Sequence, residues 1–208
     1  MDKNFIIGIP LRDFRDPMTR LSSDINLDER INLMKHMFLN IVKSFQETNV
    51  EIFSITKDSS VIDYSKKIGI ESFISKSKGL SEEAIEFLNS NKKYKGWTIC
   101  HADLPYITKY YAKNWINECM NNEILICESK DSGTPLIGGK NYIESFHYGK
   151  NSYKKHTEML NNENINYKKV FHKELSFEVD DLEDYKQLVK NQPRWLRKIS
   201  NTSTPDRI

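Results

Sequence analysis

Residues 97–107 read WTICHADLPYI, an apolar, β-prone run that ends in an acidic residue. Gly96 precedes the run, and Asp103 stands where the predicted strand stops. Open α/β sheets bind ligands at the carboxyl ends of their strands, so a carboxylate here is well placed to hold a divalent cation. The competing interpretation is that Asp103 only caps a helix that begins near Pro105. Other acids that could meet Asp103 would favour the cation.

The rest of the chain alternates between short apolar runs and amphipathic segments. The apolar runs predict strands, and apolar residues spaced three and four apart predict helices. This alternation is typical of an α/β, three-layer sandwich with a mostly parallel central sheet. We expect strands over residues 5–10, 50–56, 70–74, 97–100, 123–127, 168–171 and 175–179, and helices over 28–47, 61–67, 81–89, 107–120, 153–161 and 182–190.

Length, charge, apolar content and cysteine spacing argue against several classes of protein. The 208 residues are enough for a single domain over 1–208, with a tail from about residue 192. A net charge of +2, from 31 basic and 29 acidic residues, argues against nucleic acid as the main partner. No apolar stretch reaches the ~20 residues of a membrane span, and the N-terminus leaves no room for a signal peptide. Cys100, Cys119 and Cys127 form no Cys-x-x-Cys pair, which indicates reduced core thiols in a cytoplasmic protein.

A basic loop, residues 11–23, follows the first predicted strand. It carries Arg12, Arg15 and Arg20, and guanidinium groups grip phosphate oxygens in a bidentate way. The alternative is an ordinary solvated loop whose charges face water. The chain has neither a Gly-x-Gly-x-x-Gly nor a Gly-x-x-x-x-Gly-Lys motif, which argues against dinucleotide oxidoreductases and P-loop enzymes.

A second acidic landmark lies near the end of the last predicted strand. Glu178 and Asp180 are two residues apart and so share a face of an extended segment, while Asp181 is expected to cap the final helix. Acids near Asp103 and near Asp180 can converge on one metal at the sheet edge that the basic loop also faces. That arrangement suits nucleotidyl transfer, in which a cation neutralises triphosphate charge and an oxyanion attacks the α-phosphorus.

Two segments rich in small residues are candidates for ligand contacts. In residues 129–139, Gly133 would let a backbone approach a ligand closely and Thr134 could donate a hydroxyl; the alternative is a plain loop or hairpin. Ser152 stands at the expected start of helix 153–161, close to Gly149 and two lysines. A helix N-terminus of this kind suits an anion, or is an ordinary cap. His156 lies within that helix and is interpreted as a surface or core histidine.

The order of these motifs resembles the 2-phospho-L-lactate guanylyltransferase family of deazaflavin-coenzyme (factor 420) biosynthesis. The resemblance runs from about residue 7 to residue 188. It is carried by residues 9–12 and 19–21, by 29–30, by 102–105, by 133–134, by 148–149 with Ser152 and His156, and by 178–180 with 183–184. It implies a Rossmann-like nucleotidyltransferase fold. It also implies transfer of GMP from GTP to 2-phospho-L-lactate, phosphoenolpyruvate or 3-phosphoglycerate, with release of pyrophosphate.

The resemblance also implies roles for particular residues. Asp103 and Asp180 would be catalytic and hold magnesium, with Glu178 as a third ligand, and Arg12 and Arg20 would contact the triphosphate. The expected substrate-binding residues are Thr134, Gly149, Ser152, Gly133, Gly79 and Ser81. The implied partners are therefore a nucleoside triphosphate and a small phosphorylated acid. A homodimer stays open.

Some positions depart from the family pattern. The family usually has lysine where Arg12 and Met18 stand, asparagine where Ser81 and Pro135 stand, and aspartate where Glu178 stands. These departures keep two alternatives open. One is a cytidylyltransferase acting on a phosphonate or another phosphorylated acid, and the other is a noncatalytic nucleotide-binding relative. A glycosyltransferase is disfavoured because no Asp-x-Asp follows the central strand.

Overall fold

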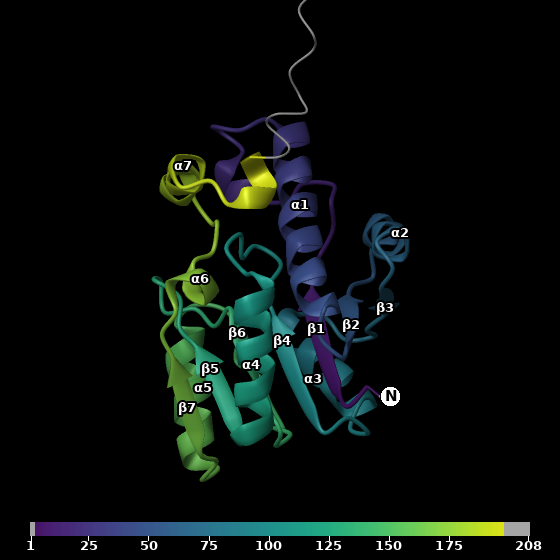
Figure 1. Ribbon diagram of the computed structural model, residues 1–208, viewed down its shortest axis with the longest axis vertical. Helices are drawn as coiled ribbons and strands as arrows, with labels where there is room; N and C mark the ends of the chain where they lie inside the picture. Colours follow the sequence, from purple (N-terminus) through teal and green to yellow (C-terminus); the bar gives the residue numbers. More distant parts are fainter. Residues whose placement is uncertain (1–2, 198–208) are drawn as a thin grey trace, which may run out of the picture.

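The computed structural model describes residues 3–197 and contains one seven-stranded sheet in the order β3-β2-β1-β4-β6-β5-β7 (Figure 1). The strands are β1 (Phe5–Pro10), β2 (Val50–Ile55), β3 (Glu71–Phe73), β4 (Gly96–Cys100), β5 (Ile124–Cys127), β6 (Leu136–Gly139) and β7 (Tyr167–Val170). The helices are the 3-10 turn η1 (Thr19–Leu21), then α1 (Leu27–Gln46), α2 (Ser59–Lys67), α3 (Leu80–Ser90), α4 (Lys109–Asn121), α5 (Ser152–Asn162), α6 (Lys173–Ser176) and α7 (Leu182–Lys190).

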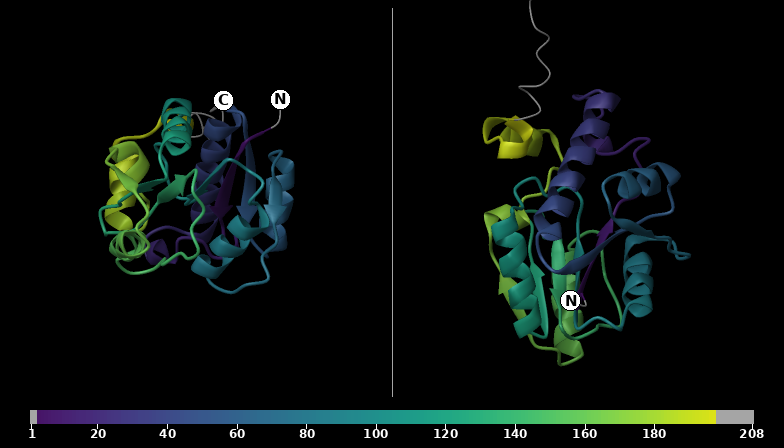
Figure 2. Two further views of the ribbon diagram at one scale, coloured as in Figure 1. Left: turned by 90° about the horizontal axis from the view of Figure 1, so that it is seen from below. Right: turned by 45° about the vertical axis from the view of Figure 1, so that its right-hand side comes forward.

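Helices cover both faces of the sheet, because apolar side chains alternate along the buried strands. On β1, Phe5, Ile7 and Ile9 belong to the core that packs under α1, α2 and α4. Ile6 faces the opposite way, into the core formed with α3 and α5. The left view of Figure 2 shows α1 and α4 on one side of the sheet and α3 and α5 on the other. The predicted three-layer α/β sandwich is confirmed.

The sheet is mostly parallel, as predicted, but its one reversed strand was missed. Strand β6 runs antiparallel to both β4 and β5, and it lies within residues 129–139, which the sequence offered as a loop or hairpin. Pro135, Gly138 and Gly139 are residue types with low β-propensity, so β-propensity does not predict this strand. Those glycines are required by packing. A Cβ on Gly138 would meet the Trp97 carbonyl, and one on Gly139 would meet the Glu123 carbonyl.

Two local predictions are wrong at helix ends, and so is the alternative interpretation of Asp103 as a helix cap. Helix α3 has Gly79 at its N-cap, in a backbone conformation with φ +100°, so Ser81 is inside the first turn. Helix α5 is preceded by Asn151 in the left-handed conformation, and Ser152 is its first helical residue. Helix α4 begins only after Thr108, so Asp103 does not cap it. The structural interpretation of Asp103 as a helix cap is therefore excluded.

The region before the last helix also differs from prediction. Residues 175–179 were expected to form a strand, but a short helix, α6, occupies Lys173–Ser176, and residues 177–180 are extended without joining the sheet. Asp181 caps α7 as predicted, and the Asp181 backbone N–H donates in return to the Asp184 carboxylate, which completes a capping box. Within residues 3–197, no helix is both long enough and apolar enough to cross a bilayer. The cysteines are buried and unpaired, as expected.

The close approach at β6 makes a stability prediction. Gly139→Ala places a methyl group against backbone atoms of β5, which cannot swing aside as a side chain would, so we expect a loss of about 1–3 kcal/mol in the free energy of unfolding. Urea denaturation measures this difference. Lys140→Ala, at the exposed neighbouring position, is the control. A Gly139→Ala protein as stable as that control would contradict the packing argument.

Candidate active site

A backbone hydrogen bond joins the two acidic segments that the sequence separates by some seventy residues. The Val179 N–H donates to the carbonyl of Asp103 over 3.2 Å. Val179 turns its side chain into the core and is only 2% exposed. Since alternate residues of an extended chain face opposite ways, Glu178 and Asp180 turn together toward the other side. This contact places both landmarks at the carboxyl end of β4.

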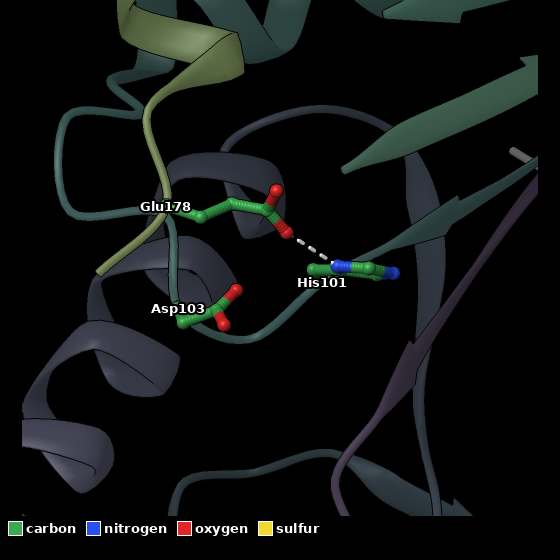
Figure 3. Close-up of side chains that lie close together, drawn as sticks. All are labelled: His101, Asp103 and Glu178. Carbon is green, nitrogen blue, oxygen red and sulfur yellow. Dashed lines mark hydrogen bonds and ion pairs between the residues drawn. The ribbon is translucent and has the colours of Figure 1, made fainter. Parts of the chain in front are cut away.

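The side chains there form two overlapping groups. Ligand atoms of His101, Asp103 and Glu178 all lie within 4.8 Å of one another, and so do those of Asp131, Glu178 and Asp180. Glu178 belongs to both groups, so Asp103 and Asp180 each lie close to Glu178. Figure 3 shows the Asp103 and Glu178 carboxylates turned toward a common space, with the His101 ring beside them. Asp103 and Asp180 do not share a group with each other, and their convergence on one metal stays a prediction.

Burial and mutual repulsion shape the protonation of this cluster. Burial, and next the charge of Glu178, raise the pKa of Asp103 to about 7. Burial and Glu178 also raise the pKa of Asp180, while Arg20 acts in the opposite direction. Burial of the His101 ring disfavours its charged form, but its hydrogen bond and charge interaction with Glu178 outweigh burial and raise the pKa of His101 to about 9. His101 Nδ1 and Glu178 Oε1 are 2.6 Å apart.

The donor set fits a hard divalent cation. Oxygen ligands are those that Mg²⁺ prefers, and three carboxylates gather here. Asp103 Oδ1 is buried and has no hydrogen-bond partner among the described residues. A buried carboxylate oxygen without a partner is costly unless something positive meets it. Asp103, Asp180 and Glu178 are thus the residues that would hold magnesium, and their assignment as ligands stays a prediction.

The arginines of the 11–23 loop border this cluster. Arg20 Nη1 lies 3.8 Å from Asp180 Oδ1, and its side chain is 70% exposed. Arg12 is 98% exposed and its Nε lies 3.9 Å from Asp13 Oδ2. Two adjoining hollows of about 640 and 670 Å³ share a wall that contains Pro10, Leu11, Arg12, Asp13, Arg15 and Leu80. Each arginine thus lies beside an acid, and Arg12 is the more exposed of the two.

Each hollow also has residues of its own. The first adds His101, Asp103 and Met18, and the second adds Gly79. Met18 has a left-handed backbone with φ 54° and packs partly against the core. Its thioether side chain is uncharged, so it supplies no positive charge to this wall. Ser81 lies in the first turn of α3, where its hydroxyl accepts a hydrogen bond from the Tyr148 N–H at 2.9 Å.

The structure gathers the predicted acid-binding residues into a second cluster. Ser152 Oγ donates to Thr134 Oγ1 over 3.1 Å, and both residues are buried. Gly133 borders the carboxylates, because a Cβ at that position would lie 3.4 Å from Glu178 Oε2. Gly149 has φ +105°, and a Cβ there would meet no atom within 4 Å. Thus Gly133 adjoins the carboxylates of the first cluster, while Gly149 faces open space.

The sequence did not identify two members of the cluster around Glu178. His101 is two residues before Asp103, the same spacing that marked Glu178 and Asp180, so the rule of alternate facing could have found it. Asp131 gave no such signal. It lies in a loop and accepts a hydrogen bond from Ser129 over 2.5 Å, and only the tertiary structure brings it beside Glu178.

Comparison with known proteins now places the chain. Residues 5–207 match the family described as guanylyl transferase CofC like. The chain belongs to this family. A 2-phospho-L-lactate guanylyltransferase of Methanosphaera stadtmanae is 28% identical over 192 residues, which are 87% of this chain and 82% of that protein. Another from Methanocaldococcus jannaschii is 29% identical over 162 residues, 76% of this chain and 70% of that one.

Solved structures place this guanylyl transferase relative within a broader fold. A structure described as a nucleotide-diphospho-sugar transferase from Desulfovibrio desulfuricans G20 superposes with a TM-score of 0.82 at 14% identity, covering 96% of each chain. At that identity the match shows the fold alone. The Rossmann-like nucleotidyltransferase fold expected from the sequence is confirmed.

The raised pKa of Asp103 predicts an unusual pH dependence of stability. Its pKa is higher in the folded chain than in the unfolded chain, where it is near 4, so stability falls as pH rises from about 4 through about 7. Asp103→Asn removes this effect. Without divalent cations we expect the free energy of unfolding of the variant to exceed that of the wild type by ~4 kcal/mol at pH 8 and by little at pH 4.

Thermal or urea unfolding across this pH range measures the difference. Asp63→Asn, on the exposed side of α2, is the matched control and should follow the wild type throughout. A constant offset between the Asp103→Asn variant and the wild type from pH 4 to pH 8 would contradict the raised pKa.

Proposed function

We propose that this chain is a magnesium-dependent guanylyltransferase. It transfers GMP from GTP to a small phosphorylated acid, such as 2-phospho-L-lactate, phosphoenolpyruvate or 3-phosphoglycerate, and releases pyrophosphate. The observation that carries the proposal is the convergence of Asp103 and Asp180 on Glu178, beside an arginine-bearing loop, in a member of a guanylyl transferase family. The name of both relatives, 2-phospho-L-lactate guanylyltransferase, supports GTP as the donor. Biosynthesis of the deazaflavin coenzyme factor 420 is the pathway that we propose for the product.

The chemistry needs no general base. A phosphate oxygen of the acid, already anionic at neutral pH, attacks the α-phosphorus of the triphosphate. The new bond joins that oxygen to the α-phosphorus, and the bond from the α-phosphorus to the bridging oxygen breaks. Both electrons of the broken bond leave with pyrophosphate. The absence of a Ser-His-Asp or Cys-His arrangement among the residues singled out for the site agrees with this chemistry.

The protein's part is to bring together two anions that repel each other. Magnesium held by Asp103, Asp180 and Glu178 would supply positive charge to the triphosphate. Arg12, nearly fully exposed on the wall of both hollows, adds guanidinium contacts to phosphate oxygens. Arg20 lies beside Asp180 and can bridge that carboxylate and a phosphate. Gly79, at the start of α3, lets the nucleotide approach the backbone closely.

A second candidate is a noncatalytic nucleotide-binding relative, and Met18 is the observation that favours it. Met18 lines the same hollow as Arg12 and Asp103, and its thioether brings no positive charge to a place where a triphosphate would need it. The loss of one cation weakens phosphate binding without removing the carboxylates. Turnover therefore decides between the two candidates.

Pyrophosphate release tests the proposal directly. Each of four nucleoside triphosphates is paired with a panel of phosphorylated three-carbon acids and one phosphonate, with and without Mg²⁺. We expect release with GTP and one acid, only with the cation, and a loss of about 10²-fold or more in Asp103→Asn. Glu158→Gln, on the exposed side of α5, is the control. Release only with CTP would favour a cytidylyltransferase, and no release with any pair would favour the binding protein.

Met18→Lys tests the electrostatic weakness of the nucleotide hollow. The backbone there is already left-handed in the wild type, so exchanging one long, unbranched side chain for another adds little strain. We expect the dissociation constant for the triphosphate to fall several-fold at low salt, and the gain to shrink at high salt because the charge is screened. Fluorescence titration with a labelled triphosphate measures it. Unchanged affinity at low salt would show that Met18 lies away from the phosphates.

A further inference from the structure

The second hollow, of about 670 Å³, is lined by none of the three carboxylates assigned to the cation. Asp103 lines the first hollow, of about 640 Å³, and the two hollows share the wall that carries Arg12. A triphosphate that meets both the cation and Arg12 therefore has its phosphates in the first hollow. The nucleoside at its other end then extends across the shared wall into the second.

Apolar side chains form part of the second hollow. Pro10 and Leu11 come from the end of β1, Ile55 ends β2, and Leu80 begins α3. Apolar surfaces of this kind suit the flat faces of a nucleobase, while a few fixed polar groups recognise its edge. The groups that distinguish one base from another must therefore be found among the charged residues of this lining.

Three carboxylates line the second hollow, and the protein itself occupies two of them. Asp58 Oδ1 caps α2 by accepting from the Ser60 and Val61 N–H groups at 3.0 and 3.3 Å, and its Oδ2 lies 3.7 Å from Arg15 Nε. Asp13 accepts from the backbone N–H of Arg15 and from its guanidinium group. Neither carboxylate has an oxygen without a partner.

Glu83, in the first turn of α3, is the third carboxylate, and one of its oxygens is free. Its Oε1 accepts from Lys57 Nζ at 3.1 Å, and no hydrogen bond joins Oε2 to any other residue that the structure describes. An ammonium group has three N–H donors, and Lys57 gives one to Glu83 and one to the Ser77 carbonyl. The hollow thus offers one remaining N–H donor beside one free carboxylate oxygen. The two side chains are 41% and 22% exposed for Lys57 and Glu83, so a ligand can reach both.

Hydrogen bonds behind this pair hold it in place. Glu86, about one turn further along α3, accepts from the Ser75 hydroxyl at 2.6 Å and from the Ser77 N–H at 2.9 Å. The Ser77 carbonyl, which is the second partner of Lys57, is therefore fixed to the same helix that carries Glu83. A donor and an acceptor that are held in this way are already ordered before a ligand arrives.

A donor beside an acceptor selects among the bases. Guanine carries the O6 acceptor next to the N1–H donor, with the 2-amino group beyond it, so Lys57 can donate to O6 while Glu83 accepts from N1–H and from the 2-amino group. Adenine and cytosine carry an amino donor next to a ring nitrogen that accepts, which is the opposite order. Uracil repeats the guanine order but lacks the third donor. Of the four bases, guanine therefore matches the pair most fully.

We propose that Glu83, paired with Lys57, is the residue that selects guanine in the triphosphate donor. This inference rests on the proposed function, because it assumes that the phosphates lie beside Arg12 and the cation in the first hollow. It requires neither turnover nor any particular acceptor acid. Glu83 contacts the base alone, so its loss should change the preference among triphosphates and leave their shared affinity in place.

Glu83→Gln tests this selection. We expect the wild type with Mg²⁺ to bind GTP about tenfold or more tighter than ATP or CTP, and the GTP–ATP ratio to fall about tenfold in the variant. The hypoxanthine of ITP lacks the 2-amino group, so the wild type should bind GTP about threefold or more tighter than ITP, and Glu83→Gln should abolish that difference. Isothermal titration calorimetry with each triphosphate measures these ratios.

Glu82→Gln is the matched control. It removes the same charge from the same turn of α3, and Glu82 is exposed and does not line the hollow. Any general gain in triphosphate affinity from the lost negative charge should appear in both variants, whereas the control should keep the wild-type ratios. ATP affinity equal to that of the control shows that Glu83→Gln is folded.

Several outcomes would overturn the proposal. They are an unchanged GTP–ATP ratio in Glu83→Gln, an equal loss of every triphosphate in that variant, and equal binding of GTP and ITP by the wild type. Tighter binding of CTP than of GTP by the wild type would overturn it as well. Failure of the proposed function is measured separately, by pyrophosphate release. A protein that prefers GTP through Glu83 and releases no pyrophosphate would keep this inference and would not be a guanylyltransferase.

Discussion

The Val179 N–H that donates to the Asp103 carbonyl is the contact on which the active site depends. It ties the segment after β4 to the segment before α7, and neither of those segments belongs to the sheet. Because the Val179 side chain is buried in the core, the side chains of Glu178 and Asp180 point the opposite way, toward the side on which Asp103 lies. A slip of one residue would turn Glu178 and Asp180 away and leave Asp103 alone. One backbone hydrogen bond thus decides whether three carboxylates meet.

Bringing those carboxylates together is unfavourable, and the chain offsets the repulsion in two ways. His101, held against Glu178, supplies a positive charge inside the cluster, and Arg20 supplies another at its rim beside Asp180. What remains is a site that still favours protons or cations, as the raised pKa of Asp103 shows. An apolar replacement would make the fold more stable, but it could not steady a triphosphate.

The cluster of Thr134, Ser152 and His156 is built on the opposite principle. There the groups are neutral, buried and satisfied by one another, so that hydrogen-bond direction and not charge prepares the site. Such a network is rigid because each member has one arrangement that satisfies all of its bonds. The two clusters border each other at Gly133, which adjoins Thr134 in the chain and Glu178 in space.

The alternation of apolar runs with amphipathic segments by itself determined the layers of this protein. A parallel sheet that is buried on both faces needs apolar strands, and the helices that cover it need one apolar face each. Period-two spacing likewise predicted that Glu178 and Asp180 share a direction, and the same rule applied to position 101 would have found His101. Strand β6 left no such trace. Glycine is required at positions 138 and 139 because backbone atoms of the neighbouring strands lie too close for a Cβ atom. The sequence of β6 alone does not show how close those strands come. Tertiary structure alone decided that Asp131 would join the acids and that His156 would lie within hydrogen-bond distance of Thr134 and of the His147 N–H, since both depend on which distant parts of the chain lie within reach.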